Sequence, residues 1–132
     1  MIVKEINIGG ATFRIEYRTA EEDFGPAIRV FADVNGEARQ VLRFDCFADD
    51  PHYHYDPTGV NKMFHLDEMT MGCPLEFSLA QIASKTQAMI EKAGFGNTAA
   101  NINQEQITAR VDEIRDLVEQ VTEETKAEAA AG

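Results

Sequence analysis

The alternation of apolar and polar residues in the first half of the chain most constrains its fold. Residues 13–18 alternate between apolar and charged side chains, and apolar residues recur at every second position over residues 28–34. This period of two is typical of a strand with one buried face. Asn35-Gly36, directly after the second of these segments, is a strong hairpin signal. The pattern predicts an antiparallel meander.

The predicted sheet has four or five strands over residues 2–67. A glycine pair at 9–10 ends the first strand, and a polar loop over 19–25 separates the second strand from the third. The fourth strand carries Leu42, Phe44 and Cys46 on one face. Residues 63–67 predict a short fifth strand.

The apolar pattern also predicts the register of the hairpin at residues 35–36. A two-residue loop would bury Arg43 in the core, whereas a three-residue loop over 35–37 pairs Val30 with Leu42. A slip of one residue moves every side chain of a strand to the other face. We therefore expect the three-residue loop.

Two helices are predicted after the sheet, over residues 74–93 and 103–121, and together they make a single α+β domain over residues 1–121. The second helix has a narrow, heptad-like apolar seam, which would suit packing on its own sheet or on another subunit. Residues 122–132 are acidic and rich in alanine, and they predict a flexible tail.

Composition excludes several classes of partner. The formal net charge of −11 argues against nucleic acid and against an anionic membrane, which both need a basic surface. No segment approaches the roughly 20 apolar residues that span a bilayer, and residues 1–5 lack the pattern of a signal peptide. We expect a cytoplasmic protein whose two cysteines stay reduced.

Residues 50–57 form the most distinctive segment, because they hold two of the three histidines between two prolines. Extended backbone would place Asp50, His52, His54 and Asp56 on one face, where Asp56 or Asp50 could complete a ligand set and His65 could add another imidazole. Imidazole and carboxylate ligands would suit zinc, iron or manganese. The same residues could instead form an acid/base site or a hydrogen-bonded structural cluster.

The solvent-facing side of the predicted sheet mixes arginines with apolar residues, which is typical of protein interfaces. The alternative is a solvated face whose arginines pair with Glu16, Asp33 and Asp45. The candidate interface residues are Arg29, Phe31, Arg39, Val41 and Arg43.

Cys73 falls at the predicted N-cap of the first long helix, where the helix dipole favours a thiolate. It is therefore a candidate reactive thiol. Glu76 in the first turn opposes a thiolate, and small buried thiols are common, so a plain structural role is the alternative.

The run F-D-C-F at 44–47, followed by D-P-H-Y-H-Y at 50–55 and a helix that ends at Ala93-Gly94, resembles a family of small uncharacterised bacterial proteins, a domain of unknown function. The resemblance implies a small stand-alone or accessory bacterial protein. It assigns no activity and no catalytic residue.

Two functional hypotheses follow from the sequence. The first is a small accessory or subunit protein without chemistry of its own, which acts through a protein partner or through self-association. The alternative is a transition-metal-binding protein, or a metal-dependent enzyme, that uses His52, His54 and Asp56.

Overall fold

The computed structural model describes residues 1–19 and 22–132 of the chain. The loop predicted over residues 19–25 includes Ala20 and Glu21, which lie outside the described residues. The strands are β1 (Val3–Ile8), β2 (Ala11–Thr19), β3 (Phe24–Val34), β4 (Glu37–Asp45), β5 (His52–Tyr55) and β6 (Lys62–His65). The helices are α1 (Glu68–Met71), α2 (Pro74–Lys92), α3 (Gly96–Ala99) and α4 (Gln104–Ala131).

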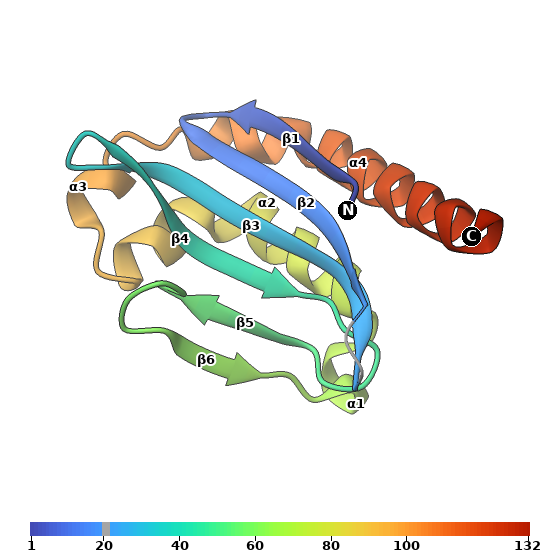
Figure 1. The fold of residues 1–132 in the computed structure, drawn as a ribbon. Coiled ribbons are helices and arrows are strands. Elements are labelled where there is room, and N and C mark those ends of the chain that lie inside the picture. Colours follow the sequence, from blue (N-terminus) through green and yellow to red (C-terminus); the bar gives the residue numbers. More distant parts are fainter. Residues whose placement is uncertain (20–21) are drawn as a thin grey trace.

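The strands form one antiparallel meander in which each strand pairs with the next along the chain (Figure 1). The α+β class is confirmed, but within residues 1–19 and 22–132 the sheet has six strands rather than four or five. The difference arises at β5. The histidine segment pairs with β4 on one side and with β6 on the other, so it is an interior strand.

In the hairpin between β3 and β4, the register differs from the prediction next to the turn and agrees with it farther from the turn. Its loop is the two-residue Asn35-Gly36, with φ of 55° and 87°, so the three-residue loop is wrong. A β-bulge beyond the turn then restores the pairing of Val30 with Leu42. The turn therefore fixes one end of the hairpin and the apolar pattern fixes the other.

Helices α2 and α4 cover one face of the sheet, with α4 packed on β1 and β2, and α2 on β4 and β5 (Figure 1). The core lies between these layers. Its fully buried side chains include Phe13, Ile28, Phe44, Ile82, Ile90, Ile107 and Ile114. The opposite side of the sheet, which faces away from both helices, is called the outer face below. In the part of the chain that the structure describes, no helix is long and apolar enough to cross a membrane.

Helix α4 continues to Ala131, whereas the sequence predicts a flexible tail after residue 121. Its buried residues end at Val121, and the last turns extend past the sheet (Figure 1). Alanine, glutamate and lysine have high helix propensity, which favours continuation of the helix. An ion pair of 2.8 Å between Lys4 and Glu124 also ties this part of α4 to β1.

The turn between β1 and β2 allows a matched test of the packing of the sheet against the start of α4. Gly9 has φ of +60°, and a Cβ there would lie 2.5 Å from the backbone oxygen of Asn103. Gly36 has φ of +87°, and a Cβ there meets no described atom within 4 Å. Alanine at positive φ lowers the free energy of unfolding by about 1 kcal/mol in each variant. We expect Gly9→Ala to lose about 1–3 kcal/mol more than Gly36→Ala in urea unfolding, because of the clash. Equal losses would contradict this packing.

Candidate metal centre

The pairing of β4 with β5 brings one carboxylate and two imidazoles together on the outer face. Asp45 pairs with His52, and Arg43 pairs with His54. Paired residues in an antiparallel sheet point to the same face, and so do residues two apart on one strand. The prediction that His52 and His54 share a face is therefore confirmed. Their ring centroids are 4.9 Å apart.

Both histidines direct Nε2 at the same carboxylate oxygen. Asp45 Oδ2 lies 2.8 Å from Nε2 of His52 and 3.1 Å from Nε2 of His54. The side chain of Asp45 is 1% exposed, and those of the two histidines are 11% and 5% exposed. Three side chains with metal-ligating atoms thus converge in a site that is largely buried from solvent.

The other nitrogen of each imidazole ring is held by an oxygen acceptor. Nδ1 of His52 donates to the backbone carbonyl of Asp50 over 2.7 Å. Nδ1 of His54 lies 2.7 Å from Oδ1 of Asn61, in the loop between β5 and β6. In a ring whose only proton is on Nδ1, the lone pair of Nε2 faces Asp45. This arrangement is the one that metal-binding histidines usually have.

Arg43 completes the cluster. Its Nε donates to Asp45 Oδ2 over 3.0 Å, and its Nη2 donates to Nε2 of His54 over 2.8 Å. Burial alone would raise the pKa of Asp45, but the hydrogen bond from His52, the contact with His54 and the charge of Arg43 hold it well below its usual range. The hydrogen bond to Asp45 raises the pKa of His52. The site is thus built around a carboxylate that stays ionised.

The second oxygen of Asp45 is not satisfied. Oδ1 is buried and has no hydrogen-bond partner among the described residues. A buried carboxylate oxygen without a partner is costly, so native sites of this kind usually hold a further group. The cluster therefore has an unused acceptor next to its two imidazoles.

Asp56 is not brought to the histidines, which contradicts its place in the predicted ligand set. Its φ of 50° turns the backbone away from the line of β5. Its carboxylate binds Arg39 over 2.7 Å and the backbone N–H of Val60 over 2.9 Å, so it holds the loop after β5. The alternation that predicted this ligand fails because the strand ends at Tyr55.

His65 lies on β6 directly opposite His52, with the ring centroids 5.6 Å apart. Its Nδ1 lies 2.7 Å from Asp50 Oδ1, and these residues form a second cluster with His52. His65 and Asp50 are more than half exposed, so this second cluster lies at the rim of the buried one.

The candidate interface residues divide between the two sides of the sheet. Arg29 and Phe31 lie on the outer face, where Arg29 pairs with Glu16 over 2.7 Å and the Arg14 guanidinium lies over Phe31. Arg43, the third, closes the cluster.

The bulge removes the other two candidates from that face. Val41 is completely buried in the core. Arg39 pairs with Ala32, a core residue, and its guanidinium lies over the ring of Phe95. The prediction from the sequence was wrong for these two residues because it assumed one register along the whole hairpin.

Cys73 lies where the sequence predicts it, at the N-cap of α2 with Pro74 after it. Its thiol is free and exposed, whereas that of Cys46 is free and buried. Burial raises the pKa of Cys46 to about 12, against a hydrogen bond to Ser78.

Asp45 is a residue of the candidate site that the sequence analysis assigned only to charge pairing. The signal was present, because residues 43 and 45 occupy the outer face if Phe44 faces the core. It became usable only once the histidine segment was known to pair with β4.

The fold and the buried His/Asp cluster define a small α+β domain with a potential ligand centre on its open sheet face. The chain belongs to the family described as a domain of unknown function, DUF7700, whose model matches residues 5–118. This match contains the whole sheet from Glu5 onward and every residue of the cluster. No curated protein and no solved structure matches the chain.

The buried cluster and its exposed neighbour should respond differently to the loss of one charge. Asp45→Asn removes the carboxylate that compensates Arg43 and His52, and breaking a buried pair of this kind costs about 3–5 kcal/mol. Asp50→Asn breaks only the exposed contact with His65, which is worth about 0.5 kcal/mol. Urea unfolding in the presence of a chelator compares the two variants. Similar losses would show that Asp45 does not organise the cluster.

Proposed function

We propose that the protein is a metal-binding protein that holds one divalent transition-metal ion between Asp45, His52 and His54. The observation that carries the proposal is the convergence of both imidazole Nε2 atoms on a single buried carboxylate. When both rings carry their proton on Nδ1 alone, two Nε2 lone pairs and an anionic oxygen meet at one point, where a divalent ion would be held.

The surroundings of the cluster support an ion. Both Nδ1 atoms are fixed by oxygen acceptors, which orients the rings and sets their tautomers. Asp45 Oδ1 is buried and unpartnered among the described residues, and an ion chelated by the carboxylate would contact it as well. Two histidines and one carboxylate suit zinc, iron or manganese.

Arg43 is the competitor of the ion. Its guanidinium already contacts Asp45 and His54, so it neutralises the site when no metal is bound. Its side chain is 20% exposed, which leaves it a path toward solvent. Binding of one divalent ion would therefore displace the Arg43 guanidinium and release one proton from His52.

The proposal is completed by the role of an accessory protein. We take it to be bacterial and cytoplasmic, a setting in which Cys46 and Cys73 remain free thiols. The site residues support metal binding and assign no reaction.

Metal content tests the proposal, with the two aspartates as a matched pair. Protein incubated with zinc, iron or manganese salts and then desalted should retain about one equivalent of one of these metals by elemental analysis. Asp45→Asn should lose most of it, because a ligand is removed, whereas Asp56→Asn should retain it. Less than about a tenth of an equivalent in the unmodified protein, with no uptake on titration, would refute the proposal.

Replacing Arg43 should strengthen metal binding, because it removes a cation that occupies the ligand atoms. We expect Arg43→Met to lower the Kd by about tenfold or more in competition with a chromophoric chelator. Arg14→Met removes the same charge elsewhere on the outer face, from a pair with Glu5, and should change the Kd by less than about twofold. A weaker affinity in Arg43→Met would mean that the guanidinium supports the cluster rather than competing with an ion.

A further inference from the structure

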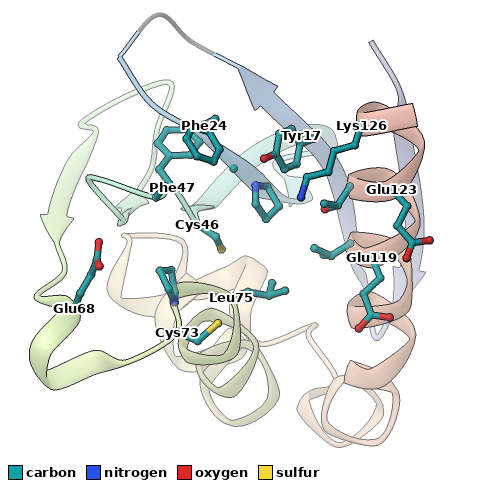
Figure 2. Close-up of a pocket in the computed structure, with 16 residues that line it drawn as sticks. Tyr17, Phe24, Cys46, Phe47, Glu68, Cys73, Leu75, Glu119, Glu123 and Lys126 are labelled. Atoms are coloured by element: carbon teal, nitrogen blue, oxygen red, sulfur yellow. The ribbon is translucent and has the colours of Figure 1, made fainter. Parts of the chain in front are cut away.

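A groove of about 530 Å³ lies between the C-terminal half of α4, the start of α2 and the adjoining ends of β2, β3 and β4 (Figure 2). No ligand of the candidate metal centre lines it, so it is a separate feature of the molecule. Its larger apolar lining residues include Tyr17, Phe24, Pro26, Phe47, Leu75 and Val118.

A large apolar side chain is left in water at this groove. Phe24 is 52% exposed, beside Phe47 on the strand side of the groove (Figure 2). Apolar surface of this kind, bordered by polar residues, marks sites where proteins bind one another.

The charged residues of the groove are mostly acidic. Glu68, Glu119 and Glu123 line it, with Lys126 as the basic residue among the described lining residues. Glu119 and Glu123 lie one turn apart on α4 and form an acidic rim beside the groove, whereas Lys126 extends toward Tyr17 (Figure 2). The rest of the chain adds to this potential, since the formal net charge is −11.

We infer that the groove binds a basic amphipathic segment of a partner protein. The apolar side chains of that segment would pack against Phe24, Phe47 and Leu75. Lysines or arginines on the other side of that segment would pair with the acidic rim of α4. A helix with one apolar face is the form of peptide that most often fills such a groove. The complementary charge sets the orientation and speeds the encounter.

The chain itself offers no suitable occupant of the groove in its own C-terminal helix. Residues 122–131 carry three glutamates and a single lysine, so they have the same sign of charge as the groove. A second copy docked through that segment would place like charges together, which disfavours binding. The acidic residues of the groove therefore favour a different, basic chain as its occupant.

The probe is a designed helical peptide with leucines on one face and lysines on the other, labelled for fluorescence anisotropy. A peptide of the same composition in scrambled order is the control. We expect the amphipathic peptide to bind at least about tenfold more tightly than the scrambled one. It should also slow alkylation of Cys73, which lines the groove and is exposed, whereas Cys46 is buried.

The variants separate a docked segment from general attraction to an acidic protein. Phe24→Ser and the double variant Glu119→Gln/Glu123→Gln should each weaken binding about fivefold or more. Glu91→Gln/Glu105→Gln makes the same change in charge outside the groove and should have less than about a twofold effect. Lys126→Gln should strengthen binding, since it removes the basic residue of the lining.

Three results would overturn the inference. The first is equal binding of both peptides, or equal effects of the two glutamate pairs, which indicates charge attraction alone. The second is weaker binding in Lys126→Gln, which indicates an anionic occupant. The third is a dimer in analytical ultracentrifugation that Phe24→Ser dissociates, which makes a second copy the occupant. None of these results bears on metal content.

Discussion

The carboxylate of Asp45 is buried on a sheet face that α2 and α4 do not cover, and Arg43, His52 and His54 are arranged around it. A charge removed from water must be matched by opposite charge and by hydrogen bonds. Arg43 and His52 provide these from two adjacent strands, and His54 adds a second imidazole. The register of β4 and β5 is thereby tied to chemistry on the outer face as well as to packing in the core.

The strand alternation and the helix patterns were sufficient to predict the class of the fold and the pairing of Val30 with Leu42. They could not predict the bulge, because two local rules disagree over the same hairpin. The Asn35-Gly36 turn demands a two-residue loop, and the apolar pattern demands a register that this loop cannot give alone. An extra residue at Val41 satisfies both rules, and it turns Arg39 toward the helices.

Only part of the candidate site could be predicted from the sequence, because some of its contacts are local and others depend on the pairing of strands. Alternation within one extended segment correctly places His52 and His54 together, because that inference needs only local geometry. It fails at Asp56, where positive φ ends the strand. Asp45 lies seven residues before His52, and its contribution depends on the pairing of two strands, which no local pattern specifies. A contact between residues of two paired strands cannot be inferred from the local pattern of either strand.

The most direct test of the account is a crystal structure of the protein grown with zinc or cobalt, with anomalous scattering measured at the absorption edge of the metal. The account predicts one peak about 2.0–2.2 Å from Nε2 of His52, Nε2 of His54 and the Asp45 carboxylate, with the Arg43 guanidinium displaced. A map without a peak there, and with Arg43 still bound to Asp45, would show that the cluster is a structural ion-pair network.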